Sequence, residues 1–527
     1  MIARSLPLPL SALIVLVVHA APPLLAEEQG AGGVAPPRIN PAVEGLYASE
    51  CASCHGDRLE GGALGPSLLQ LPFSHGESLE EIVGSIADGV PAKGMPAWKA
   101  VLSGSQIERL AMLVLERQAG FTYDSADPLD DVLQVPEKPI PSEHHSIKVE
   151  RMAGDLFFPF SIAPLPDGRV LVTEKTRGLS IVEPDGSRSA PIRATPRVYD
   201  DRSYRGAALL GSGWMLEVAL HPRYAENGWI YLSYGDRCIN CNALSRRTGE
   251  PVTMLAIVRG RIVDGRWTDE QEIWRAPVDT YLTGHNQAAG GRLTFDDEGY
   301  LYFSVGGLSQ ESGIQDLDKP YGKICRLHDD GRTPSDNPFA DVPEAMHAIW
   351  SLGHRNPQGL AYAGSTGVLW ETEHGPRGGD ELNVIVPGQN YGWPMVSMGM
   401  WYDGKPIRFA EKLGIEFDSR MLTPPVMHWT PSPGISSLVS YDRDLFPAWE
   451  GDLLVTSLRK KTLVRLETMG AKITSSETLI EGLGRFRDIE VGPRGELYVL
   501  VEVLRPTPPE RGRYDGSHLL RLTPGSP

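Results

Sequence analysis

The sequence predicts a small α-helical domain followed by an all-β domain with the six-bladed β-propeller fold. Helical periodicity of apolar residues is confined to residues 41–118, whereas residues 148–525 repeat a glycine turn followed by a strand of alternating apolar residues. An acidic, proline-rich segment, residues 119–147, separates the two and is typical of an extended linker. A chain of 527 residues has room for two or three domains.

Residues 1–26 have the pattern of a secretory signal peptide. Arg4 precedes an apolar run at residues 13–18 that is too short to span a bilayer securely, and small residues follow it. Cleavage after Ala20 or Ala26 fits this pattern. The protein is therefore expected in the periplasm. The alternative is an uncleaved anchor, and only in that case do we expect the protein to associate with a membrane.

The helical domain carries its chemistry in Cys51, Cys54 and His55. Two thiols three residues apart, followed at once by a histidine, are what covalent attachment of haem c requires. The cysteines form thioethers and His55 is placed as the proximal iron ligand. A small disulfide or half of a zinc site is the alternative, but no second Cys/His pair lies nearby to complete four ligands.

A sixth iron ligand is expected at Met95, which lies between Gly94 and Pro96. Because proline lacks an amide donor and restricts the residue before it, this methionine belongs to a loop, where a thioether is a plausible soft ligand. Met112 is the competitor, but it lies in an amphipathic helical pattern that indicates core packing. Residues 41–118 resemble a class I cytochrome c domain. The resemblance implies His/Met ligation and electron transfer without oxygen binding.

Charge and the remaining cysteines add three expectations. The formal net charge of −17 argues against a nucleic acid partner. Cys238 and Cys241 have the haem-motif spacing but no following histidine, so in an oxidising compartment a loop disulfide is expected rather than a metal site. Cys325 lies in a strand-like pattern and is expected to be a buried free thiol.

The predicted β domain repeats one unit six times. Each copy is a hairpin turn followed by a strand, and six copies predict a six-bladed propeller with long loop insertions. The uneven spacing is also compatible with a pair of β-sandwiches, whereas the lack of long helical periods disfavours α/β folds. The copies are residues 166–172, 226–232, 297–303, 366–370, 449–455 and 493–499.

Polar motifs fall between the expected strands of this domain, where a propeller places the mouth of its central channel. They are residues 218–222, 291–295, 322–324, 334–339, 353–359, 373–376, 380–383, 390–394 and 485–488. In this order they resemble the glucose/sorbosone dehydrogenase family, the soluble quinoproteins that use pyrroloquinoline quinone (PQQ). The resemblance covers the whole of residues 148–525.

PQQ is a tricarboxylate with an ortho-quinone, so its site needs cations and planar donors. Arg355, Arg485 and Arg487 have forked guanidinium groups suited to this task. The resemblance implies that Arg355 stabilises charge on the quinone oxygen and that Asn356 contacts PQQ. It further implies that Arg485 and Arg487 bind the carboxylates of the cofactor.

The adjacent carbonyls of Gly375 and Pro376 can face one way, which suits a hard cation such as Ca²⁺. By the resemblance, these two carbonyls bind the calcium that bridges to PQQ. Asp380 and Glu381 lie close by in the sequence. They either bind a second calcium ion or are solvated acids of the loop.

In the family, a histidine abstracts the anomeric hydroxyl proton while a hydride passes to the quinone. It usually lies four residues before the arginine of the Gly-Arg-Leu motif, and that position here is Ala288. His285 lies seven residues before Arg292, and a three-residue insertion in the loop would restore its place. We expect His285 to be the catalytic base. The alternative is an ordinary loop histidine.

Two further positions depart from the family pattern. A lysine that contacts PQQ corresponds roughly to Arg459, which keeps the charge but changes the geometry. A glutamine contact is replaced by Ser212. Propellers of this superfamily that hold no quinone and only bind partners also exist.

The sequence thus predicts a periplasmic quinohaemoprotein dehydrogenase that oxidises an aldose or related sugar at PQQ and reduces its own haem c. Its expected electron acceptor is another cytochrome c, a cupredoxin or a respiratory oxidase. One alternative is a non-catalytic binding propeller tethered to an electron carrier, which Ala288 favours. Another is a PQQ dehydrogenase for a polyol or other non-sugar alcohol.

Overall fold

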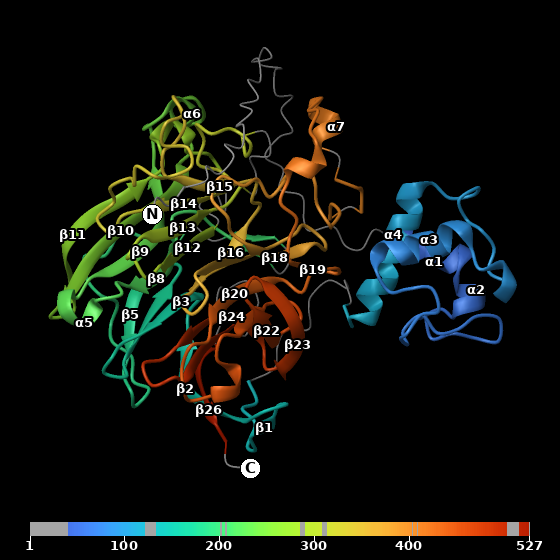
Figure 1. Ribbon diagram of the computed structural model, residues 1–527, viewed down its shortest axis with the longest axis horizontal. Helices are drawn as coiled ribbons and strands as arrows, with labels where there is room; N and C mark the ends of the chain where they lie inside the picture. The colour runs from blue at the N-terminus through green and yellow to red at the C-terminus, as the bar shows by residue number, and fades with distance from the viewer. Residues whose placement is uncertain are drawn as a thin grey trace, which may run out of the picture. The chain divides into compact units, whose positions relative to one another are not determined.

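The computed structural model describes two groups of secondary structure, one helical and one made of strands (Figure 1). The described residues are 41–121, 133–200, 203–205, 208–284, 290–307, 313–402, 404–407, 409–502 and 516–525. The predicted signal segment, residues 1–26, lies outside them. Within these ranges no helix has both the length and the apolar character needed to cross a membrane.

The first group is the predicted helical domain. It contains α1 (Pro41–Glu50), α2 (Ala52–His55), α3 (Leu79–Asp88), η1 (Pro91–Lys93) and α4 (Gly104–Gln118). Both longer helices after the haem motif begin with a capping box, Ser78 with Glu81 and Ser103 with Gln106, which satisfies the free amides at each start. Their apolar faces are buried in two clusters, one of which also contains residues of α1, and this confirms the helical periodicity predicted from the sequence.

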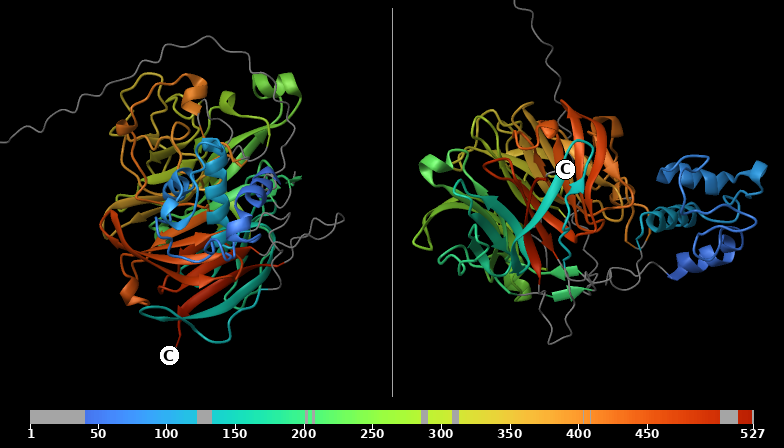
Figure 2. Two further views of the ribbon diagram at one scale, coloured as in Figure 1. Left: turned by 90° about the vertical axis from the view of Figure 1, so that its right-hand side faces the viewer. Right: turned by 90° about the horizontal axis from the view of Figure 1, so that it is seen from below.

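The second group is a closed ring of six antiparallel sheets, counted over the described residues (Figure 2). The innermost strands contact one another around the ring in the order β3, β8, β12, β16, β20, β24 and back to β3. This arrangement confirms the predicted six-bladed β-propeller.

The blades follow one another along the chain. The first blade contains β3 (Pro159–Pro164), β4 (Val170–Glu174) and β5 (Gly178–Val182). The second contains β8 (Met215–Leu220), β9 (Ile230–Cys238), β10 (Val252–Val263) and β11 (Arg266–Arg275). The third contains β12 (Gly290–Phe295), β13 (Leu301–Val305), β14 (Lys323–Leu327) and β15 (Ile349–Leu352). The fourth blade contains β16 (Pro357–Ala363), β17 (Val368–Glu373), β18 (Asp380–Val384) and β19 (Met427–Trp429). The fifth contains β20 (Ile435–Ser440), β21 (Leu453–Ser457), β22 (Thr462–Met469) and β23 (Lys472–Glu481).

The last blade closes the ring with strands from both ends of the domain. It contains β24 (Arg485–Val491), β25 (Leu497–Glu502), β26 (Ser517–Pro524), β2 (Ser146–Leu156) and β1 (Ile140–Pro141). β2 pairs with β26 in antiparallel register, with Val149 opposite Leu522. Because β1 and β2 begin at residues 140 and 146, the C-terminal part of the segment predicted as linker is strand.

Shorter elements lie between the blades. They are the hairpin β6 (Ser203–Arg205) and β7 (Ala208–Leu210), the helices α5 (Tyr224–Asn227), α6 (Ala243–Thr248) and α7 (Phe409–Leu413), and the 3₁₀ turns η2 (Val278–Thr280), η3 (Ser419–Met421) and η4 (Pro447–Trp449). The predicted loop disulfide is present between Cys238 and Cys241, and Cys325 is a buried free thiol on β14, as expected.

One buried guanidinium fastens four inner strands at the centre of the ring. Arg292 on β12 places Nη1 2.7 Å from a carboxylate oxygen of Glu217 on β8 and 2.7 Å from one of Asp488 on β24. Its Nε donates to the carbonyl of Gln358 on β16 at 2.6 Å. All three charged side chains are buried, so each relies on the others for its solvation.

Candidate functional site

The haem motif is held in the geometry that iron ligation needs. His55 ends α2, and its Nδ1 lies 2.9 Å from the carbonyl oxygen of Pro66. With the Nδ1 proton donated to this carbonyl, Nε2 is the ring nitrogen left for iron, and the ring orientation is set. Gly65 permits this approach, because a Cβ there would lie 3.2 Å from Cε1 of His55 and 2.9 Å from the Cys54 carbonyl oxygen.

The surroundings of the motif fit a covalently attached haem. Cys51 and Cys54 are free thiols, so both are open to thioether formation. The loop that follows exposes three leucine side chains to solvent: Leu64 at 74%, Leu69 at 41% and Leu71 at 54%. Exposed apolar side chains in the loop that follows two thiols are a surface that a bound porphyrin would cover.

The two candidate sixth ligands lie in different settings. Met95 follows η1 on a loop and pairs through its backbone with Val90, with N–O distances of 3.0 and 3.2 Å. Met112 lies inside α4 and is fully buried. The loop position expected for Met95 is therefore present, while its ligation of iron remains a prediction.

At the hub of the propeller, Arg355 lies against the loop that follows β17. It precedes the inner strand β16, and its Nη1 donates to the carbonyls of His374 at 2.8 Å and Gly375 at 3.1 Å. Asn356 places Nδ2 3.2 Å from Nδ1 of His374. The predicted quinone-side residues and the predicted calcium loop, which continues to Pro376, are thus brought together.

Arg485 and Arg487 start the inner strand β24 and share one carboxylate. Arg487 donates to both oxygens of Glu502, Nε at 2.8 Å and Nη2 at 3.1 Å, and Arg485 Nε lies 3.4 Å from one of them. Burial opposes ionisation of Glu502, but Arg487 and Lys175 override it and lower its pKa to about 2. Glu502 is therefore an anion, and sequence reasoning missed it.

His374 connects the two groups of arginines. Its pKa is lowered to about 3 by burial and then by the positive charges of Arg355, Arg487 and Arg485. The imidazole is therefore neutral near pH 7. The charges of all three arginines thus act on the His374 imidazole.

The centre is lined by polar atoms that lack partners. The buried nitrogens without a hydrogen-bond partner in the described part of the chain include four here: Nε of Arg355, Nε2 of His374 and the indole nitrogens of Trp214 and Trp393. Unpaired buried donors are costly, and a bound polar ligand would satisfy them. Cations, unpaired donors and two indole rings together fit a planar polyanion, which is the chemical character of PQQ.

Asp380 holds the predicted calcium loop. Its Oδ1 accepts from the backbone amide of Gly375 at 2.9 Å, and its Oδ2 accepts from that of Ile435 at 2.9 Å. It is fully buried, so of the two alternatives left open by the sequence, the solvated loop acid is wrong for this residue. Burial raises its pKa to about 6, although the two backbone amides oppose this.

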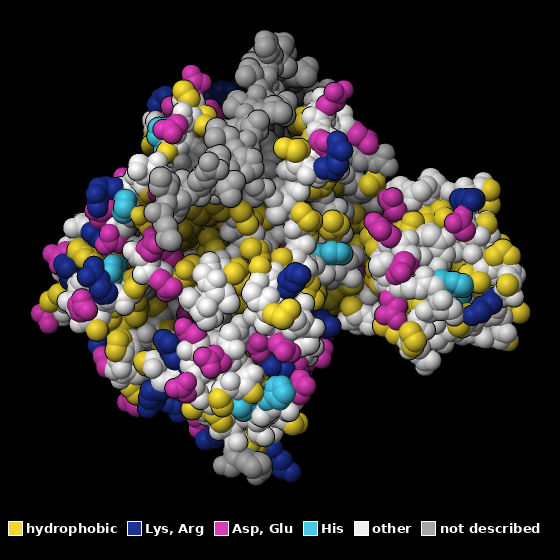
Figure 3. Space-filling model, in the orientation of Figure 1, with side chains coloured by type: hydrophobic (Ala, Val, Ile, Leu, Met, Phe, Trp, Pro, Cys, Tyr) yellow, Lys and Arg dark blue, Asp and Glu magenta, His cyan; other side chains and the backbone are white. Residues whose placement is uncertain are grey.

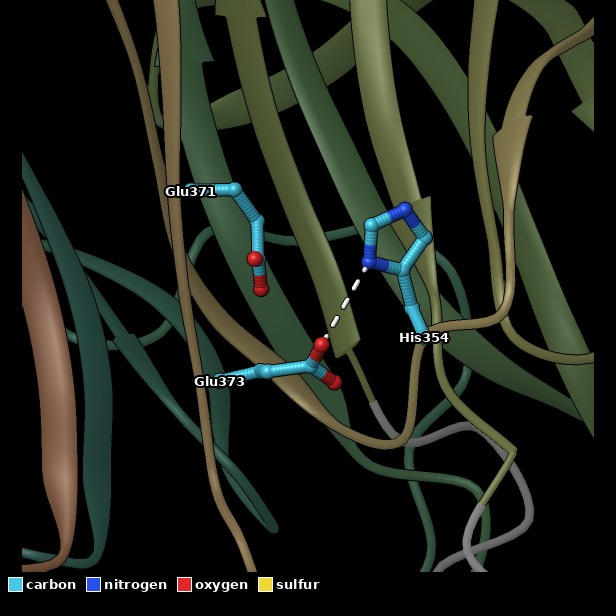
Figure 4. Close-up of side chains that lie close together, drawn as sticks. All are labelled: His354, Glu371 and Glu373. Atoms are coloured by element: carbon cyan, nitrogen blue, oxygen red, sulfur yellow. Dashed lines mark ion pairs between the residues drawn. The ribbon is translucent and has the colours of Figure 1, made fainter. Parts of the chain in front are cut away.

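A second buried cluster lies beside Arg355 and Asn356 (Figure 4). His354, Glu371 and Glu373 point toward one another, with one ligand atom of each within 4.8 Å of the others. Glu373 accepts from the backbone amides of Arg355 and Asn356, and His354 Nδ1 lies 3.5 Å from it. Burial and the charge of Glu373 raise the pKa of Glu371. The cluster can hold a proton or a cation. It also positions Arg355, because Glu373 accepts hydrogen bonds from the backbone amides of Arg355 and Asn356.

Three remaining expectations have different outcomes. His285 and Ala288 lie outside the described residues, so the base stays a prediction. Arg459 lies in the turn between β21 and β22, and its guanidinium stacks over the ring of Phe121 at 4.0 Å. Ser212 is buried shortly before β8.

The site residues share one rule of position. Arg355 and Arg485 stand at the starts of inner strands, whereas Lys175, His374 and Glu502 stand at the ends of second strands. Because these strands are antiparallel, their starts and ends lie on the same face of the ring. Elsewhere, on the face shown in Figure 3, acidic and basic side chains are interspersed over the described surface.

Family comparisons agree with the two-part organisation. The profile described as Glucose / Sorbosone dehydrogenase matches residues 156–505, more than half of the chain. The profile described as Cytochrome C oxidase, cbb3-type, subunit III matches residues 40–113.

Individual relatives match the propeller. Aldose sugar dehydrogenase YliI of Escherichia coli (strain K12) is 35% identical over 361 residues, which are 68% of this chain and 90% of the relative. The crystal structure of the soluble aldose sugar dehydrogenase from Escherichia coli in the apo-form is 32% identical with a TM-score of 0.59, covering 72% of this chain and 100% of that one. The PQQ-bound aldose sugar dehydrogenase from Streptomyces coelicolor shares the fold at 24% identity and a TM-score of 0.52, covering 73% of this chain and 99% of that one.

Proposed function

Since the chain belongs to the glucose/sorbosone dehydrogenase family and carries a cytochrome c domain, we propose that it is a PQQ-dependent dehydrogenase of aldoses or related sugars that reduces its own haem c. The observation that carries this proposal is the hub cluster. The charges of Arg355, Arg485 and Arg487 act on His374, whose Nε2 is buried without a partner in the described residues, and His55 is oriented for iron in the same chain.

The residues present divide the task of holding PQQ. Arg485 and Arg487 would bind its carboxylates, Arg355 and Asn356 its quinone side, and the carbonyls of Gly375 and Pro376 a calcium ion. PQQ, when bound, supplies a two-electron acceptor. In the helical domain, Cys51 and Cys54 would hold the porphyrin, with His55 and Met95 as axial ligands. Haem c, when bound, supplies a one-electron carrier.

The protein groups around the substrate have distinct roles in this proposal. His285 takes the proton of the sugar hydroxyl as general base. Arg355, fixed by the carbonyls of His374 and Gly375, stabilises negative charge that develops on a neighbouring oxygen. His374 stays neutral, which removes one positive charge from the site and leaves its Nε2 available as a hydrogen-bonding group.

We place this activity in the periplasm, because residues 1–26 have the pattern of a signal peptide and haem c attachment is an exported-protein chemistry. The proposed external acceptor is another cytochrome c, a cupredoxin or a respiratory oxidase. A binding propeller without catalysis is the second candidate. Ala288, in the position of the family base, favours it.

Reconstitution separates the two candidates. Apoprotein stripped of divalent cations is incubated with PQQ and Ca²⁺ together, and with each alone, and dye-linked dehydrogenase activity is then measured with a panel of aldoses and polyols. We expect activity with aldoses only when both are present. PQQ that binds without activity toward any compound in the panel contradicts the dehydrogenase and supports the binding propeller.

A further inference from the structure

Lys175 is a buried cation that the proposed function has not used. It follows β4 directly, and its backbone is fixed on both sides: its amide donates to the carbonyl of Phe158 at 3.0 Å, and its carbonyl accepts from the amide of Met215 at 3.0 Å. Its side chain is 10% exposed. The position is the same end of a second strand at which His374 and Glu502 stand in their blades.

The ammonium group lacks a good partner. Within the described residues, Nζ makes no hydrogen bond, and its ion pair is with Oε1 of Glu502 at 3.7 Å, which is longer than a hydrogen bond. The rest of its surroundings are aromatic. Nζ lies 5.7 Å from the ring centre of Phe160 and 5.4 Å from that of Trp214. Cation–π contacts of this kind compensate only part of the lost hydration.

The neighbouring charges do not cancel. When Lys175 is protonated, Lys175, Arg485 and Arg487 carry three positive charges, and Glu502 is the carboxylate that all three share. Arg487 also lies 6.0 Å from the ring of Phe160, so it and Lys175 flank the same aromatic group. A cluster with an excess of two positive charges and an unsatisfied ammonium is built to receive an anion that carries more than one carboxylate.

We infer that Lys175 is a third cation of the carboxylate-binding cluster, and that Glu502 is the counter-ion that keeps the three cations together until an anionic ligand binds. This inference rests on the proposed function, because PQQ is the polycarboxylate considered. It adds a binding residue on the blade formed by β3, β4 and β5, where the sequence motifs had indicated none.

Titration behaviour agrees with this geometry. Burial, reinforced by the charge of Arg487, lowers the pKa of Lys175 to about 7, while Glu502 opposes the shift and Arg485 and Arg292 add to it. A bound carboxylate would favour the protonated amine. The affinity for a polycarboxylate is therefore expected to fall as the pH rises above 7, once the ammonium of the free protein loses its proton.

The test is equilibrium dialysis of PQQ against the full-length haem-containing apoprotein with Ca²⁺, which measures binding without turnover. Lys175→Met removes the charge and keeps much of the length, Lys175→Arg keeps the charge, and Lys472→Met removes an exposed lysine on β23 as the matched control. Each protein is also dialysed against the trimethyl ester of PQQ, which lacks the carboxylates. Far-ultraviolet circular dichroism and the haem spectrum check that each variant is folded.

Lys175→Met is expected to raise the Kd for PQQ at least about tenfold, whereas Lys175→Arg stays within about threefold of wild type and Lys472→Met is unchanged. The ester is expected to bind wild type and Lys175→Met alike. A Kd for PQQ within about twofold of wild type in folded Lys175→Met overturns the inference and leaves the proposed function intact. If Lys175→Met does not fold, the test uses Lys175→Arg instead. In that case, a change in the Kd for the ester, relative to wild type, that is as large as the change in the Kd for PQQ overturns the inference. Wild-type protein that binds no PQQ contradicts the proposed function itself.

Discussion

The carboxylate of Asp380 accepts a hydrogen bond of 2.9 Å from the backbone amide of Gly375, which lies five residues before it in the chain. The bond fixes a loop whose carbonyl also accepts from Arg355. A buried acid on the first position of β18 therefore links the predicted calcium loop to the inner strand β20, through the amide of Ile435. Asp380 therefore positions the loop, because it accepts a hydrogen bond from the amide of Gly375 and does not contact the loop carbonyls.

Replacing Asp380 with asparagine is expected to destabilise the protein and loosen the loop. Asparagine has one acceptor oxygen, so one of the two backbone amides at Gly375 and Ile435 loses its partner, at a cost of about 1–3 kcal/mol. Thermal unfolding of the apoprotein measures the first effect, and the Ca²⁺ concentration needed for half-maximal PQQ binding measures the second. An unchanged Ca²⁺ requirement with lowered stability would restrict Asp380 to a structural role.

Arg292 is expected to be structural despite lying in a motif shared with the dehydrogenase family. Arg292→Met leaves Glu217 and Asp488 buried without their cation, which costs about 3–5 kcal/mol. Chemical denaturation of the apoprotein checks this. The double variant Arg292→Met with Glu217→Gln is expected to recover part of the loss. A single variant as stable as wild type would show that Arg292 does not hold the hub together.

The stability of the apoprotein is expected to depend on pH through the titration of Lys175. Its pKa is about 7 in the folded protein and near its ordinary value in the unfolded chain, so between these values the unfolded chain holds a proton that the folded protein has lost. Stability relative to Lys175→Met is therefore expected to rise with pH above 7, by up to about 1.4 kcal/mol per pH unit. Denaturation midpoints from pH 6 to pH 10, a range of about four units around this shift, check this. Parallel curves for the two proteins would contradict it.

The two methionines are expected to respond differently to truncation. Met95→Ala should remove the long-wavelength Met–iron absorption band and lower the haem reduction potential, because a soft axial ligand is lost. Met112→Ala should leave the spectrum unchanged but cost about 2–5 kcal/mol of stability, since its side chain is fully buried. Visible spectra and redox titrations separate these effects. Loss of the band in Met112→Ala instead would reassign the ligand.

His285→Ala is expected to lower kcat roughly 10²- to 10⁴-fold while leaving the Kd for PQQ unchanged, as removal of a general base should. His428→Ala, which alters an exposed histidine on β19, is the control. Steady-state kinetics with the best aldose and dialysis with PQQ give the two quantities. Turnover near the wild-type rate in His285→Ala would show that another group is the base.

The second strand of every blade was predictable, because its signal is local. The six turn-and-strand repeats coincide with β4, β9, β13, β17, β21 and β25. In each, a glycine turn sets the hairpin and the apolar run that follows is buried. Closure of the ring was not predictable, since the pairing of β2 with β26 joins the two ends of the domain and leaves no local pattern.

The site was predictable where its residues belong to motifs. Arg485 and Arg487 lie in the first three residues of the inner strand β24, and Arg355 lies two residues before the inner strand β16, so all three stand at the starts of inner strands. Lys175 and Glu502 were missed, although Glu502 is the last residue of β25 and Lys175 directly follows β4 at the same face. A charged residue at that position is the signal that could have found them. The sequence left two alternatives open for Asp380, because its contact with β20 joins strands that are distant in the sequence.

In the proposed function, electrons taken from a sugar at the propeller reach the haem of the same chain. The most direct measurement is the anaerobic visible spectrum of full-length protein loaded with PQQ and Ca²⁺, oxidised and then mixed with an aldose in the absence of dye. We expect the spectrum to show reduction of the haem, seen in its α band, only when PQQ, Ca²⁺ and the sugar are all present. A haem that stays oxidised with every sugar tested, while PQQ is demonstrably bound, would contradict it.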